Sequence, residues 1–175
     1  MKEMESTLKK LKFLESLDGK DIATLAGYAK LERFRAGEVI FKEGSKGDAI
    51  YLIVSGKVEI TKMLDGREVI LAVLEDDSPF GEMDVLSPTK AGRVAGVRAK
   101  TDCELVLIPG RKIGEGLKKE EITIYKLIYI FTRVISNRLR KMDEEYTNLY
   151  IKCSSDNGRA ELKSFREKIM KEWQF

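Results

Sequence analysis

Histidine does not occur anywhere in this chain of 175 residues. Its absence removes the usual general base of serine and cysteine nucleophile systems, together with a ligand that most zinc sites use. Cysteine is scarce as well, with Cys103 and Cys153 in unlike surroundings. Cys103 lies in an apolar run, where we expect a buried, unreactive thiol, whereas Cys153 lies in a polar segment and is expected to be exposed. These absences predict a protein that is not an enzyme and that uses no metal ion or cofactor.

Long apolar runs and a strong excess of charge are missing too. No stretch of about 18 apolar residues is present, and Met1 to Ser6 lacks the apolar core of a secretory signal, so we expect a cytoplasmic protein without a membrane span. The 32 basic and 29 acidic residues give a net charge of +3, which is too balanced to indicate nucleic-acid binding by charge alone. The length suits one domain with an appendage.

The chain changes its hydrophobic period twice. Leucines at steps of three and four over residues 7–29 predict two short helices joined by a turn at Asp18-Gly19. The period is two from Leu31 to Leu107, and the best strand candidates are Val39–Phe41, Ile50–Val54, Val58–Thr61, Val69–Leu74, Arg93–Ala99 and Cys103–Ile108. Asp65-Gly66 is the strongest hairpin signal, because a tight turn needs positive φ. The pattern predicts a mainly β fold with flanking helices, an antiparallel β-barrel or jelly roll of about eight strands.

A long helix is expected over residues 120–150, which contain neither proline nor glycine. One apolar stripe runs its whole length, and a second stripe (Ile124, Leu127, Ile130, Val134) is confined to its first half. We expect the barrel to cover that first half and a second copy of the helix to cover the continuous stripe, giving a homodimer through residues 124–149. The expected division is therefore N-terminal helices (1–30), barrel (31–119), dimerisation helix (120–150) and a short helical tail (151–175).

The stretch from Pro79 to Leu86 and the segment Arg93–Ala99 carry the clearest chemical signal. Gly81 permits a tight turn, and a helical turn after it would expose unpaired N–H groups to an anion. The guanidinium of Arg93 can contact two phosphate oxygens, and Glu82 can accept from a sugar hydroxyl.

Several glycines fall in order with these residues. Phe41-Lys42-Glu43-Gly44 and Gly47-Asp48 precede an apolar strand, Gly56 follows it, and Phe80-Gly81-Glu82, Arg93 and a long helix come after. Over residues 7–145 this order resembles the cyclic-nucleotide-binding domain of catabolite activator protein and of the regulatory subunits of cyclic-AMP-dependent protein kinase.

The resemblance implies a phosphate-binding cassette from Phe80 to Ala99. Arg93 would bind the phosphate, Glu82 the ribose 2′-hydroxyl, and the backbone of Gly81 and Met83 would donate hydrogen bonds. It further implies base contacts from the long helix, partly from the dimer mate, with Asp143 accepting from an adenine amino group. The predicted ligand-binding residues are Phe80, Gly81, Glu82, Met83, Arg93, Val94 and Asp143.

Three positions depart from the pattern that the resemblance implies. Val94 and Gly96 stand where hydroxyl residues are common, which favours cyclic AMP over cyclic GMP. Asp84 stands near the expected phosphate, and two unit charges about 6 Å apart repel by about 3 kcal/mol at an effective dielectric constant near 20. Affinity would fall unless Asp84 points away.

Three functions stay open. The favoured one is a sensor of a cyclic nucleotide, with cyclic AMP as its ligand, that changes dimer geometry or the docking of a protein partner. The alternative is a structural dimerisation or protein-interaction module whose cassette binds nothing. The third, a DNA-binding regulator, is disfavoured because the roughly 25 residues after Tyr150 are too few for a winged helix-turn-helix.

Overall fold

The computed structural model describes residues 1–87 and 92–152. It divides the chain into two units, Met1–Phe131 and Thr132–Phe175. The second unit is described only as far as Lys152, so the predicted break at residues 153–158, the final helix and Cys153 lie outside the described residues.

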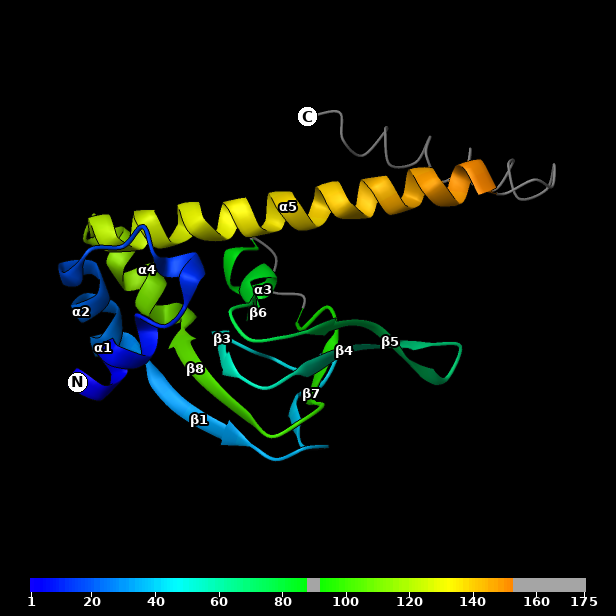
Figure 1. Cartoon of the computed structure of the whole chain (residues 1–175), viewed down its shortest axis with the longest axis horizontal. Helices are drawn as coiled ribbons and strands as arrows, with labels where there is room; N and C mark the ends of the chain where they lie inside the picture. Colours follow the sequence, from blue (N-terminus) through cyan, green and yellow to red (C-terminus); the bar gives the residue numbers. More distant parts are fainter. Residues whose placement is uncertain (88–91, 153–175) are drawn as a thin grey trace. The chain divides into compact units, whose positions relative to one another are not determined.

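The elements follow one another as helices, strands and helices again (Figure 1). Their bounds are α1 (Lys2–Leu8), a single 3₁₀ turn η1 (Lys12–Leu14), α2 (Gly19–Tyr28), β1 (Lys30–Phe34), β2 (Val39–Phe41), β3 (Ala49–Ser55), β4 (Val58–Leu64), β5 (Arg67–Leu74), β6 (Pro79–Phe80), α3 (Glu82–Leu86), β7 (Gly96–Ala99), β8 (Cys103–Pro109), α4 (Gly110–Lys118) and α5 (Ile122–Lys152).

The strands of the described residues form two antiparallel four-stranded sheets, in the orders β1-β8-β3-β6 and β2-β7-β4-β5. The predicted mainly β fold with flanking helices is confirmed. The hairpin at Asp65-Gly66 is confirmed too, since both residues have positive φ, 49° and 75°, where β4 turns into β5.

Strand β3 explains how the first unit is layered. Ile50 and Leu52 point to a core shared with α1, α2, α4 and the start of α5, while Tyr51 and Ile53 point to a second core between the two sheets. A strand apolar on both faces can separate two cores because successive side chains alternate. Figure 1 shows these helices gathered on one side of the strands.

Three expectations need correction. The first helix begins at Lys2, earlier than the predicted start at residue 7. Helix α4 lies within the 31–119 segment that was expected to be barrel, and its glycine-rich sequence was not predicted as a helix. The strand predicted over Arg93–Ala99 begins only at Gly96, so Arg93 lies in the preceding loop.

Three of the four residues in the first-half stripe of α5 are buried as expected, while Val134 is half-buried. Ile124, Leu127 and Ile130 are at most 5% exposed in the core of the first unit, and Phe131 joins them. Within residues 1–87 and 92–152, no helix is long and apolar enough to cross a bilayer.

Candidate functional site

Arg93 is anchored by its backbone to the loop between β2 and β3. Its N–H donates to the carbonyl of Ser45 at 2.9 Å, and its carbonyl accepts from the N–H of Gly44 at 2.8 Å. This reciprocal pair of hydrogen bonds fixes the backbone of Arg93 near the start of β3. A loop residue held at both backbone groups can direct its side chain inward with little loss of further entropy.

The side chain of Arg93 does point inward, and it is 2% exposed. Nη1 donates to Asp84 Oδ2 at 2.8 Å and to the carbonyl of Gly81 at 3.2 Å, while Nη2 donates to the carbonyl of Ala49 at 3.0 Å. Nε is buried and has no hydrogen-bond partner among the described residues. A buried cation of this kind is stable only when oxygen atoms surround it.

Aromatic rings complete the surroundings of the guanidinium. Arg93 Cζ lies 4.0 Å from the ring centroid of Phe41 and 6.0 Å from that of Tyr51. Tyr51 in turn stacks on Phe80, with centroids 5.0 Å apart and an interplanar angle of 7°. The negative ring faces add cation–π attraction, which is strongest in a site shielded from water.

Two glycines let the backbone approach Arg93 closely. A Cβ atom on Gly47 would lie 2.1 Å from Arg93 Nε, and one on Gly81 would lie 2.8 Å from Nη1. Gly81 also has φ of 78°, in the left-handed region that favours glycine. The guanidinium therefore fits its position only because both residues lack a side chain.

The short helix α3 starts directly after Gly81. Its first residue, Glu82, is 2% exposed, and its second, Met83, is 56% exposed. Val94, on the other side of Arg93, is 50% exposed, and its carbonyl accepts from Lys62 Nζ at 3.1 Å.

The structure thus brings Phe80, Gly81 and Arg93 together, with Glu82 next to them on α3. Met83 and Val94 direct their side chains to solvent, so only their backbones are near this cluster. Asp143 is exposed on α5 in the second unit, and its assignment to the site stays a prediction. Phe41 and Gly47 were not predicted as site residues, although Gly47 stands in the Gly-Asp pair before β3.

Asp84 is the point at which the site differs from expectation. We expected a carboxylate that would repel a phosphate some distance away, or that would point outward. The structure instead places Asp84 on the guanidinium itself, with its side chain 11% exposed.

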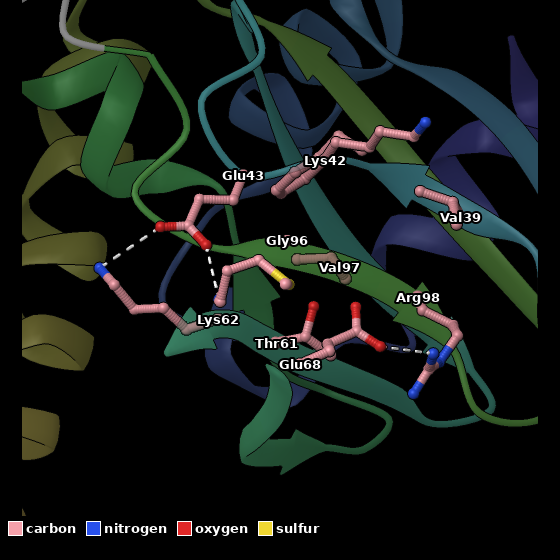
Figure 2. A pocket seen from close by; sticks show the side chains of 11 residues that line it. Val39, Lys42, Glu43, Thr61, Lys62, Glu68, Gly96, Val97 and Arg98 are labelled. Carbon is pink, nitrogen blue, oxygen red and sulfur yellow. Dashed lines mark hydrogen bonds and ion pairs between the residues drawn. The ribbon is translucent and has the colours of Figure 1, made fainter. Parts of the chain in front are cut away.

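A groove of about 310 Å³ opens on the sheet β2-β7-β4-β5. Figure 2 shows Glu43 and Lys62 facing each other at one end, and Glu68 beside Arg98 at the other. Phe41 lines this groove and also contacts Arg93, so the groove lies one side chain away from the guanidinium.

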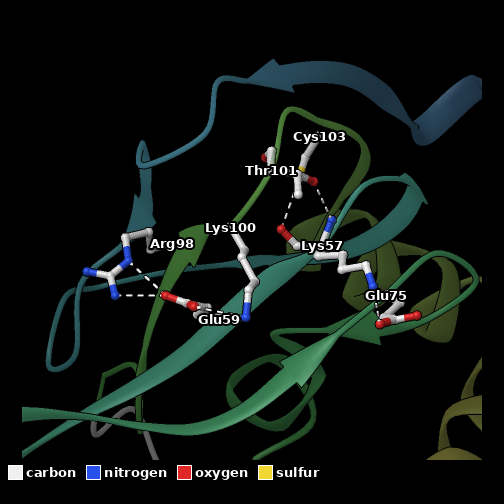
Figure 3. A network of polar contacts seen from close by, with 7 residues as sticks. All are labelled: Lys57, Glu59, Glu75, Arg98, Lys100, Thr101 and Cys103. Atoms are coloured by element: carbon white, nitrogen blue, oxygen red, sulfur yellow. Dashed lines mark hydrogen bonds and ion pairs between the residues drawn. The ribbon is translucent and has the colours of Figure 1, made fainter.

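A second polar cluster stabilises the outer face of the same sheet (Figure 3). Glu59 pairs with Arg98 at 2.8 Å and with Lys100 at 3.5 Å, and the hydrogen bond from Arg98 is the main reason that the pKa of Glu59 is lowered. Arg98 of β7 therefore bridges Glu59 of β4 and Glu68 of β5.

Cys103 is buried, as expected from its apolar run. Its Sγ lies 3.2 Å from the carbonyl of Lys57 and 3.1 Å from that of Thr101, and burial raises its pKa. A raised pKa keeps the thiol protonated and poorly nucleophilic.

The family follows from a match of sequence to this fold and site. Residues 31–120 match the cyclic nucleotide-binding domain family, and the chain belongs to it. This confirms the resemblance seen in the order of glycines, Glu82 and Arg93.

Several relatives are named as regulators. A CRP-like cAMP-activated global transcriptional regulator from Mycobacterium tuberculosis is 26% identical over 83% of this chain and 63% of its own length. A cAMP-dependent protein kinase regulatory subunit from Emericella nidulans is 36% identical over 58% of this chain and 24% of its own length. The crystal structure of Thermus thermophilus catabolite activator protein superposes with a TM-score of 0.65 at 27% identity, covering 78% of this chain and 62% of that one. The chain thus spans less than two thirds of the length of these three relatives.

Proposed function

We propose that this chain is a regulatory module that binds a cyclic nucleotide, preferentially cyclic AMP, and performs no catalysis of its own. One observation carries the proposal: the guanidinium of Arg93 lies inside the cassette, between Gly81, Ala49 and Phe41, and does not point to solvent. A buried guanidinium, with its planar fork of donors held in place, is suited to a singly charged phosphodiester. The names of the relatives, cAMP-activated and cAMP-dependent, support the same ligand class.

The remaining contacts follow the same arrangement. Glu82 begins α3 immediately beside Gly81, at a place from which its carboxylate would accept from a ribose hydroxyl. The preference for cyclic AMP rests on Val94 and Gly96, since neither offers a hydroxyl group to a guanine. Asp143 would act on the base as an acceptor for the adenine amino group.

We further propose that two copies pair through α5. Leu139 and Met142 belong to the continuous apolar stripe, yet they are 41% and 65% exposed, whereas Phe131 of the same stripe is buried in the first unit. Exposed apolar side chains at helical spacing are typical of a helix that packs on a partner helix. A ligand that favours one arrangement of paired helices would then change the output of the dimer or its docking to a protein partner.

Calorimetric titration with cyclic AMP and cyclic GMP tests the ligand. We expect heat with cyclic AMP and a weaker response with cyclic GMP. Arg93→Lys keeps the charge but loses the planar fork, so its affinity should fall at least tenfold, about 1.4 kcal/mol. Arg33→Ala is the matched control, because Arg33 pairs with Glu104 on the surface and its side chain is 76% exposed. Circular dichroism establishes that each variant folds.

The result that contradicts the proposal is the absence of heat with either nucleotide at high micromolar concentration. A second function would then stand, a dimerisation or protein-interaction module whose cassette binds no nucleotide. The ion pair between Asp84 and Arg93 is the observation that favours it, since the guanidinium already has an anionic partner.

A further inference from the structure

The cassette carries its own anion. Asp84 Oδ2 lies 2.8 Å from Arg93 Nη1, and the two side chains are 11% and 2% exposed. Both charges are therefore largely removed from water, and neither is screened as a surface pair would be. The pair is made within the site, because Asp84 is the third residue of α3, the helix that begins the cassette after Gly81.

The carboxylate of Asp84 occupies part of the hydrogen-bonding capacity of the Arg93 guanidinium. Nη1 is divided between Asp84 and the carbonyl of Gly81, and Nη2 is bound to the carbonyl of Ala49. An incoming phosphate needs charge-assisted contacts from the same guanidinium, preferably two side by side. It would meet the negative charge of Asp84 at the distance of neighbouring hydrogen-bond acceptors, where repulsion is strong.

We infer that Asp84 is the residue that sets the affinity of this cassette, as a built-in competitor that the phosphate of the ligand must displace from Arg93. The inference rests on the proposed function and adds its regulation. The affinity for the ligand is set by how much more strongly Arg93 binds the phosphate than it binds the carboxylate of Asp84. In the free protein the pair holds Arg93 in place, so binding exchanges an internal anion for an external one.

Asp84→Asn removes the charge while it retains the shape, and calorimetry with cyclic AMP measures the result. We expect affinity to rise at least tenfold over the unsubstituted chain. Asp84→Glu retains the charge and should bind as weakly as the unsubstituted chain. Asp76→Asn is the control for net charge, because Asp76 is an exposed acid of the loop before β6. Equal affinity of the Asn variant and the unsubstituted chain would overturn the inference and leave the proposed function standing.

Inorganic phosphate provides a readout that needs no nucleotide. Loss of one partner from a buried ion pair destabilises the fold, so Asp84→Asn should melt at a lower temperature. Millimolar phosphate should recover part of that loss, compared with chloride at equal ionic strength, and should have less effect on the unsubstituted chain or on Asp76→Asn.

Recovery by phosphate without any binding of cyclic AMP would support the competitor role and contradict the proposed function. No recovery together with no binding would contradict both. The two ideas thus fail in different ways.

Discussion

Gly47→Ala should displace Arg93 without touching any residue that contacts it by a hydrogen bond. The new methyl group would lie 2.1 Å from Arg93 Nε and 2.5 Å from Cζ, far inside van der Waals contact. The backbone of Gly47 has no positive φ, so the substitution does not force alanine into the left-handed region. Any loss of stability therefore reports on the guanidinium.

The magnitude follows from the contacts that Arg93 would give up. These are the ion pair with Asp84 and the hydrogen bonds to the carbonyls of Gly81 and Ala49. Separating a buried pair costs about 3–5 kcal/mol, and an alanine in place of glycine returns about 0.4–1 kcal/mol through the unfolded chain. We expect a net loss of about 2–5 kcal/mol in the free energy of unfolding, together with loss of nucleotide binding.

Urea unfolding followed by far-ultraviolet circular dichroism measures this loss, read from the midpoint at unchanged slope. Gly114→Ala is the matched control, because Gly114 lies within α4 and a Cβ there would meet nothing within 4 Å. The control should gain about 0.5–1 kcal/mol, as expected for alanine in a helix interior. A free energy of unfolding for Gly47→Ala within about 0.5 kcal/mol of that of the unsubstituted chain, the effect of an ordinary surface substitution, would show that Arg93 is not packed as described.

Three further outcomes are expected. Burial opposes ionisation of Asp21, but hydrogen bonds, led by the one from Lys126 at 2.6 Å, bring its pKa below 3.8. The stabilisation that ionised Asp21 provides is therefore present above pH 3.8 and is lost as the pH falls through the lowered pKa. Asp21→Asn should make the free energy of unfolding less dependent on pH in the acid range. The hydrogen bond that Tyr28 donates to Glu121 at 2.5 Å raises the pKa of Tyr28 from 10.0 to about 12. The stability that this hydrogen bond contributes is therefore lost as the pH rises between those values, and Tyr28→Phe should remove one late-titrating phenol from an absorbance titration. Leu139→Lys should shift sedimentation equilibrium toward monomer while the circular dichroism spectrum stays unchanged, and an unaltered mass would contradict pairing through α5.

The sequence by itself determined the class of fold. A period of two with β-branched residues and regular turns can bury one face of each strand only by forming packed sheets, and the long proline-free stretch can only be a helix. The order of several glycines with Glu82, Arg93 and the long helix identified the family. Those glycines are informative because they mark turns and close approaches that few other residues permit.

Local pattern did not determine where elements begin and end. Helix α4 contains three glycines within Gly110–Lys118 and has low helix propensity, yet it is stabilised because Ile113 packs in the core with Ile124 and Leu127 of α5. Likewise β7 starts at Gly96 and not at Arg93, because the backbone of Arg93 pairs with Gly44 and Ser45 instead of with a neighbouring strand.

The state of the site was decided by tertiary structure alone. From the sequence, Asp84 was an acidic residue near an expected phosphate, with its direction open. Only the packing of α3 against β3 and the inward course of Arg93 place its carboxylate 2.8 Å from the guanidinium. The physical reason is that a buried arginine must be surrounded by oxygen atoms, and the fold decides which ones. Residues 84 and 93 are only nine apart in the sequence, but that spacing alone does not place their side chains in contact.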